Sequence, residues 1–163
     1  METGARNMTY TRMLLDVLEK KEFYLQGLFD LTRQQESLLK KAEFDELEFG
    51  RLVDDKDKVI KKIEELDNGF QAIYNRVQRE FAENKEAYRE QILELQELIT
   101  RVTNLGVKIA ALEEKNRGEL EICLQGKKKH IRQFKVGKQA ADRYYKNMIG
   151  LQPGKSFFMD QKK

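Results

Sequence analysis

The sequence predicts an all-α protein: an elongated antiparallel three-helix bundle, or coiled-coil-like rod, with a long C-terminal helix and a short tail. Apolar residues recur at alternating spacings of three and four along most of the chain, which is the period of one helical face. There is a single proline in 163 residues. Charged residues make up 36% of the chain, a balance that fits long solvated helices sharing narrow apolar faces. We expect the rod to span residues 1–124, with helices at about 9–41, 45–83 and 86–124.

The first helix is predicted from an apolar stripe that ends near "KKAEFD". Thr9 or Thr11 is the expected N-cap, because a threonine hydroxyl can accept a hydrogen bond from the first turn of a helix. The short break after the stripe suits an antiparallel helix–helix connection. The stripe consists of Leu14, Val17, Tyr24, Leu28, Leu31 and Leu38.

The second helix has the most regular pattern. Asp45 followed by Glu48 has the spacing of a capping box, which predicts the helix start. The tripeptide "DNG" at 67–69 would usually indicate a turn. We predict a continuous helix instead, since the stripe keeps its phase across these residues. Its members are Leu52, Val59, Ile63, Leu66, Phe70, Ile73, Val77 and Phe81.

A third stripe follows a lapse around "AENKEAY", where Asn84 is a possible cap. The pattern leaves open whether the second and third helices separate there or run on. Asn116 lies on or beside the stripe. A buried asparagine can set helix register, but we favour a place at the edge of the apolar face. The stripe consists of Tyr88, Ile92, Leu95, Ile99, Val102, Ile109, Leu112, Leu120 and Cys123.

Residues 125–163 differ in character from the rod. They hold eleven Lys and Arg against two Asp, a net charge of +9, whereas residues 1–124 hold 20 basic and 26 acidic residues, a net charge of −6. Helical apolar spacing continues through Ile131, Phe134, Tyr145 and Ile149, but lysines crowd between these residues. Because isolated helices are marginal in water, we expect this extension to be the least stable helix, ordered against a partner.

The chain ends in "GLQPGKSFFMDQKK", where Phe157, Phe158 and Met159 follow a Pro/Gly break. Chain ends are normally polar, so these apolar side chains dock on the protein's own body or on something else. Our interpretation is that they fold back onto the sparsely apolar extension until a client displaces them. A disordered tail with incidental aromatics is the alternative.

No catalytic or cofactor-binding constellation is found. The one histidine, His130, and the one cysteine, Cys123, are two helical turns apart, too far for a nucleophile–base pair. Two such ligands do not make a zinc site, and the scattered glycines form no phosphate-binding loop. The sequence therefore predicts neither an enzyme nor a metal, cofactor or small-molecule site.

Membrane and nucleic-acid functions are also disfavoured. No apolar run approaches the ~20 residues of a membrane span, and "METGARNMTYTR" lacks the apolar stretch of a secretory signal. We therefore expect a cytoplasmic protein without membrane insertion. The stretch "GKKKHIRQFKVGKQ" could contact phosphates, but the acidic body and the few aromatic stacking positions argue against a nucleic-acid binder.

The order of motifs resembles the FlgN-type flagellar export chaperones. The resemblance rests on "LLKKAEFDELEFGRLVDDKDKVIKKIEEL", on "LQELITRVTNLGVKIAALEEKNRGEL" with its Asn116–Arg117 pair, on "ADRYYKNMIG" and on the tail "SFFMDQKK". It implies a cytoplasmic chaperone of the flagellar type III system without enzymatic activity. Such proteins bind the C-terminal helices of the hook–filament junction proteins FlgK and FlgL, prevent premature assembly and bring them to the export gate.

The resemblance places client binding in the C-terminal part, here about residues 120–163. A helix with an under-filled apolar face suits capture of an amphipathic client helix. A structural coiled coil that self-associates, for example as a homodimer, and a basic-tailed nucleic-acid binder are the alternatives, and a chaperone for the filament cap cannot be separated from the first interpretation. The expected protein-binding residues are Leu124, Ile131, Phe134, Tyr144, Tyr145, Ile149, Phe157, Phe158 and Met159.

Overall fold

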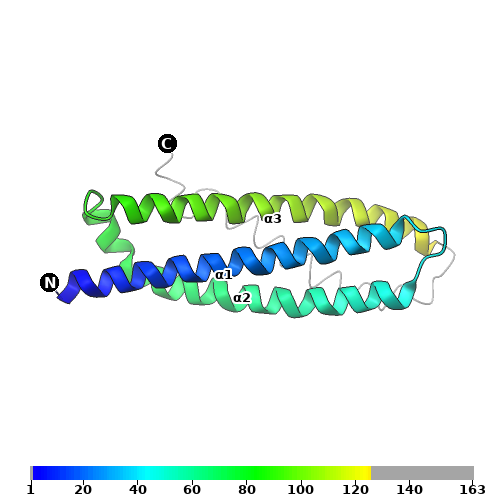
Figure 1. Ribbon diagram of the computed structural model, residues 1–163, viewed down its shortest axis with the longest axis horizontal. Helices are drawn as coiled ribbons and strands as arrows, with labels where there is room; N and C mark the ends of the chain where they lie inside the picture. Colours follow the sequence, from blue (N-terminus) through cyan, green and yellow to red (C-terminus); the bar gives the residue numbers. More distant parts are fainter. Residues whose placement is uncertain (1, 126–163) are drawn as a thin grey trace.

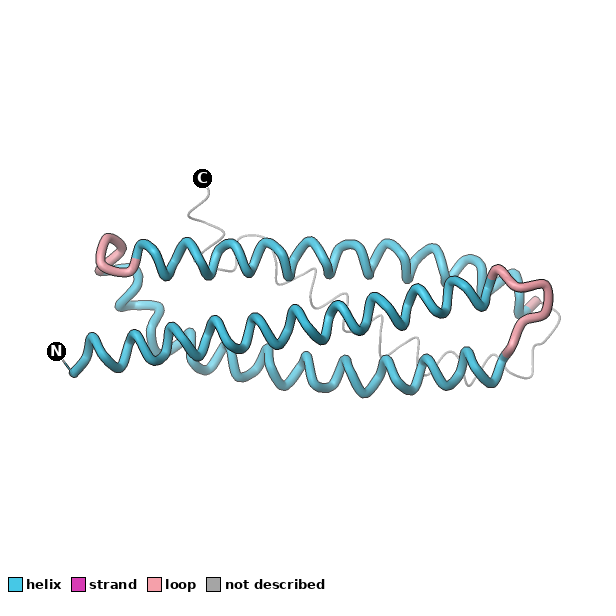
Figure 2. Tube along the Cα trace, viewed as in Figure 1, coloured by secondary structure: helices cyan, strands magenta, loops and turns pink. Residues whose placement is uncertain are grey.

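The protein forms an elongated bundle of three antiparallel helices, as the apolar spacing predicts (Figure 1). The computed structural model describes residues 2–125, and it describes the side chains of residues 9–125. Helix α1 spans Glu2–Leu39, α2 spans Glu46–Glu83 and α3 spans Arg89–Leu124. Because the connections are short, successive helices run in opposite directions along the same axis (Figure 2). No described residue lies in a strand.

Helix α1 begins earlier than predicted. The expected N-cap at Thr9 or Thr11 is wrong, since the helix is continuous from Glu2. Thr11 is 2% exposed and lies three residues before the buried Leu14, so it belongs to the inner face of the helix. A threonine in mid-helix can satisfy its hydroxyl on the preceding turn, so its presence does not mark a helix start.

Helix α1 is the shared packing partner of the other two. Its backbone packs along both α2 and α3, whereas the backbones of α2 and α3 rarely approach each other. In Figure 1 α1 accordingly lies between them over the middle of the rod, and the last turns of α2 pass behind α1 toward the turn that leads to α3. An arrangement of this kind leaves the sides of α2 and α3 that turn away from α1 without a helical partner among the described residues.

Three apolar clusters follow one another along the rod, and each takes side chains from all three helices. The cluster at the α2–α3 turn includes Phe81, and the middle cluster includes Leu28 and Ile63. The cluster at the other end joins Leu39, Leu52 and Leu124. Burying one such side chain contributes ~2 kcal/mol, so the rod is held along its length.

The start of α2 follows the predicted cap. Asp45 is the N-cap, and its carboxylate accepts a 3.1 Å hydrogen bond from the Glu48 backbone N–H. The Glu48 carboxylate turns to Arg51 in the same turn. The Asp45 side chain therefore satisfies the backbone N–H of Glu48. The Glu48 side chain forms an ion pair with Arg51 on the helix surface.

The helix is continuous through Gly69, as predicted, and it ends at Asn84. Asn84 is the C-cap of α2, and its backbone N–H donates to the Glu80 carbonyl at 3.0 Å. A turn over residues 85–88 then separates α2 from α3. Tyr88, the last residue of this turn, is buried against Phe81 with ring centroids 5.2 Å apart. The second and third helices thus separate where the stripe lapses.

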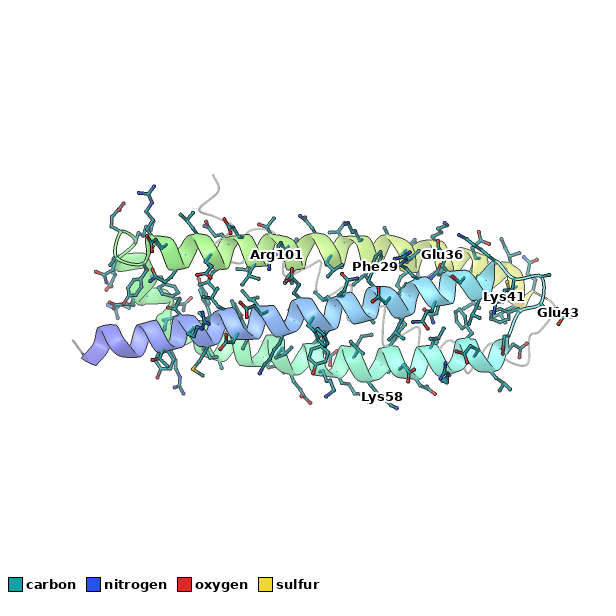
Figure 3. The ribbon with its side chains drawn as sticks, in the orientation of Figure 1. Phe29, Glu36, Lys41, Glu43, Lys58 and Arg101 are labelled. Carbon is teal, nitrogen blue, oxygen red and sulfur yellow. The ribbon has the colours of Figure 1, made fainter. Side chains whose placement is uncertain are left out.

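Two ion pairs tie α1 to α3 at the edge of their contact. The Arg101 guanidinium donates to both Glu22 carboxylate oxygens, at 2.8 and 2.9 Å, and Lys115 Nζ lies 3.0 Å from Glu36 (Figure 3). These hydrogen bonds lower the pKa of both carboxyl groups, against the opposing effect of partial burial. Their contribution to stability is therefore present above about pH 4.5 and is lost as the pH falls through the lowered pKa of the folded state.

Gly69 offers a test of the continuous second helix. A Cβ added at this position would meet nothing within 4 Å. Because alanine is favoured over glycine in a helix interior by about 1 kcal/mol, we expect Gly69→Ala to raise the free energy of unfolding by about that amount. Urea denaturation measures it. A loss of stability would mean that the chain turns at residues 67–69.

Candidate protein-binding surfaces

A layer of buried polar side chains crosses the bundle between the middle and terminal apolar clusters. Lys56 of α2 is 4% exposed, and its ammonium donates to Gln35 Oε1 of α1 at 2.7 Å. The same ammonium forms an ion pair with Glu113 of α3. Lys56 therefore connects all three helices, and it does so where α2 and α3 have little backbone contact.

The layer continues toward Asn116, which is buried. Its side-chain amide donates to the Thr32 carbonyl of α1 at 3.0 Å. The Thr32 hydroxyl donates to the Leu28 carbonyl at 2.7 Å and lies 3.4 Å from Glu113. The predicted edge position of Asn116 is wrong: it is 4% exposed and lies inside the bundle. The amide NH2 group is thus satisfied, whereas Oδ1 of the same side chain is buried without a hydrogen-bond partner among the described residues, which costs about 1–3 kcal/mol.

This layer fixes the register of the helices. A buried charge that loses its partner costs several kcal/mol, so sliding α2 or α3 by one turn would strand either Lys56 or Glu113. Sequence reasoning missed Lys56 and Gln35. The burial of Lys56 could have been predicted from its spacing. It lies seven residues after Phe49 and seven before Ile63, on the same face of α2.

Leu124 is the one predicted binding residue that lies within the described part of the chain. It is 6% exposed and packs in the terminal cluster with Leu38, Leu39, Phe49 and Leu52. The half-buried Cys123 lines the same cluster. Leu124 therefore anchors the end of α3 in the apolar core.

The other predicted binding residues lie outside the described residues, and their role stays a prediction. They are Ile131, Phe134, Tyr144, Tyr145, Ile149, Phe157, Phe158 and Met159. The tail interpretation concerns the same part of the chain.

Large apolar side chains are also exposed on the bundle itself. Phe23 of α1 is 73% exposed, and Leu47 of α2 and Ile122 of α3 are 89% and 64% exposed. Leu47 and Ile122 lie in the first turn of α2 and the last turn of α3, which are at the same end of the rod (Figure 1). Single exposed apolar residues are common in proteins, so they do not define a site individually.

The described residues contain no group of His, Cys, Asp and Glu side chains able to hold a metal ion. None of the three described helices is long and apolar enough to cross a membrane. What the described bundle offers is surface for contacts with other helices.

By their architecture, the described residues belong to the class of all-helical bundle proteins. The comparison with protein families gives the particular class: residues 8–147 match the model of the FlgN protein family. The chain therefore belongs to the FlgN family, which is a family of flagellar export chaperones and not of enzymes. No significant match was found among curated proteins or solved structures.

The extent of the family match separates two parts of the C-terminal region. It runs past the end of α3, covers residues 125–147 of the basic extension and stops before Ile149. Phe134, Tyr144 and Tyr145 are inside it, whereas Phe157, Phe158 and Met159 are outside. The extension is thus part of the family domain, and the aromatic tail is an addition to it.

The polar layer gives a second prediction. Lys56→Met leaves the mostly buried Glu113 without its cation, so we expect a loss of about 2 kcal/mol in the free energy of unfolding, with urea denaturation as the measurement. Adding Glu113→Leu to this variant should recover most of the loss, because the pair is then replaced by apolar side chains.

Lys58→Met is the matched control, since Lys58 is exposed on the same helix (Figure 3). It should change stability by less than about 0.5 kcal/mol. If the double variant is no more stable than Lys56→Met alone, the ion pair is not what the layer depends on.

Proposed function

We propose that this protein is a cytoplasmic export chaperone for hook–filament junction proteins of the FlgK/FlgL type. It binds their C-terminal helices, prevents their premature assembly and aids their delivery to the export gate. Membership of the FlgN family, over residues 8–147, is the observation that carries the proposal. The family gives the general class of chaperone, and the client and the delivery step are our inference.

The proposed client-binding region is the extension beyond α3. The rod buries its own apolar side chains in three clusters, and Leu124 closes the last of them. Residues 126–149 carry further apolar side chains at helical spacing, among them Ile131, Phe134 and Tyr145. An amphipathic client helix can cover this face, as in other helix-in-groove complexes. The basic residues between them would favour a client with acidic flanks.

The region can be tested by substitution in the full chain. We expect Phe134→Ser/Tyr145→Ser to weaken binding of a peptide from the C-terminal helix of a junction protein by at least ~30-fold. This corresponds to the ~2 kcal/mol of an aromatic hot spot. Isothermal titration calorimetry with purified protein measures the affinity. Urea denaturation of the variant shows whether the three-helix bundle keeps its stability, so that a loss of affinity is not the result of unfolding.

Phe23→Ser is the matched control, since it removes an exposed aromatic side chain from the outside of α1. It should leave the affinity unchanged. Equal affinity of the Phe134→Ser/Tyr145→Ser variant and the unmodified protein would place the binding site in the rod. Binding of a filament-cap peptide in preference to a junction peptide would overturn the proposed client.

A further inference from the structure

One face of the bundle, between α2 and α3, has no helical partner among the described residues. On α3, Arg101 and Lys115 lie on the flank that pairs with α1. Glu113 points between the other two helices, where it reaches Lys56 of α2 and lies 3.4 Å from Thr32 of α1. The flank of α3 on the far side of Glu113 from Arg101 therefore borders α2, and the two backbones stay apart. We refer to the surface formed by this flank of α3 and the adjoining flank of α2 as the α2–α3 face.

The α3 side of this face carries no charge over most of its length. Helical spacing places Gln96, Thr103, Val107 and Ala110 on it, beside the buried Gly106 and beside Ile99, which packs against the first apolar cluster. In the same stretch, the flank toward α1 carries Glu94, Arg101 and Lys108. Val107 is 51% exposed although it is a large aliphatic residue. Lone solvated faces of long helices are normally charged, so an uncharged strip with small residues is suited to close packing against another helix.

The α2 side of the face is acidic near the end of the rod where α3 stops. Asp57 and Glu64 lie seven residues apart on the flank away from Lys62, whose ammonium lies over the Tyr24 ring of α1. Within the described part of the chain, no cation forms an ion pair with either carboxylate. Partial burial raises the pKa of Asp57, with Lys61 opposing the shift. A cation placed beside this edge would be stabilised.

We propose that residues 126–149 dock on the α2–α3 face of the same molecule as an amphipathic helix, completing a four-helix bundle. The segment starts where it is needed, because Leu124 packs beside Phe49 and Leu52 at the start of α2. As a helix, its 24 residues span about 36 Å, against about 54 Å for the 36 residues of α3. It can therefore run back from the end of α3 and cover the face as far as about residue 100.

The order of residues in the segment matches the order of the face. Because Lys56 of α2 pairs with Glu113 of α3, a helix running back from Leu124 would bring Lys138 level with Asp57 and Arg143 within one turn of Glu64. The second half of the segment is richer in apolar residues and would lie along the uncharged strip of α3. The net charges of +9 beyond residue 124 and −6 before it favour the same contact. Residues 126–149 thus have the charge and the apolar side chains that docking on the α2–α3 face requires.

The proposal is tested on the full chain without any client, so its outcome is independent of the proposed function. In a Cys123→Ser background, spin labels at Asn104→Cys and Lys146→Cys report the distance from α3 to the segment by pulsed electron resonance. Asn104 is exposed and outside the strip. Docking predicts one short, narrow distance distribution at low salt, which broadens and lengthens at high salt.

Charge reversal at the acidic edge is the decisive variant. Asp57→Lys/Glu64→Lys should broaden the distribution at low salt. Glu19→Lys/Asp30→Lys makes the same change of charge on exposed positions of α1 and should leave it narrow. A broad distribution in the unmodified protein would overturn the proposal. A short distance in a mixture of molecules that each carry one of the two labels would also overturn the proposal, because the segment would then dock on a second copy of the chain.

Discussion

The structure depends on one constraint: α1 is the common packing surface for two helices whose backbones rarely approach each other. Its inner face supplies side chains to all three apolar clusters, and its two edges are tied separately, to α3 through Glu22 and Glu36 and to α2 through Lys21 and Asp67. Because α2 and α3 each bury one flank against α1, each is left with a second flank that turns away from it. Helix α1 therefore has a helix packed on each side, whereas the flanks of α2 and α3 that turn away from α1 have no helical partner among the described residues.

The polar layer adds an ion pair between α2 and α3 to the apolar contacts that their side chains make in the three clusters. Lys56 and Glu113 form an ion pair across the two helices, close to Gln35 and Thr32 of α1. Apolar side chains alone would allow α2 and α3 to slide along α1 in steps of one turn, since three-and-four spacing repeats every seven residues. A buried charge pair permits one register only. The layer thus keeps the acidic edge of α2 level with the last turns of α3, which is where the basic extension begins.

Much of the fold could be predicted from spacing alone. The three antiparallel helices, the Asp45 cap and the continuity through Gly69 are confirmed, because each depends on local sequence. The sequence pattern left open whether α2 and α3 separate at Asn84, and the structure shows that they do. The predictions of a helix start near Thr9 and of an edge position for Asn116 were wrong. A single sequence does not distinguish a polar residue on the inner face of a helix from one at a helix end or at the edge of the apolar face. The Lys56–Glu113 pair could not be predicted, because it depends on how two distant helices align. Of the predicted binding residues, Leu124 belongs to the core, and the others lie beyond the described bundle.

The account makes the basic extension both the client-binding segment and the fourth helix of the free protein. The most direct test titrates the protein that carries spin labels at Asn104→Cys and Lys146→Cys with a peptide from the C-terminal helix of a junction protein. If one apolar face serves both contacts, the short distance should disappear in proportion to the peptide bound, because the client and the α2–α3 face compete for it. Saturating peptide binding with an unchanged distance would contradict the account, because the client would then occupy a different surface.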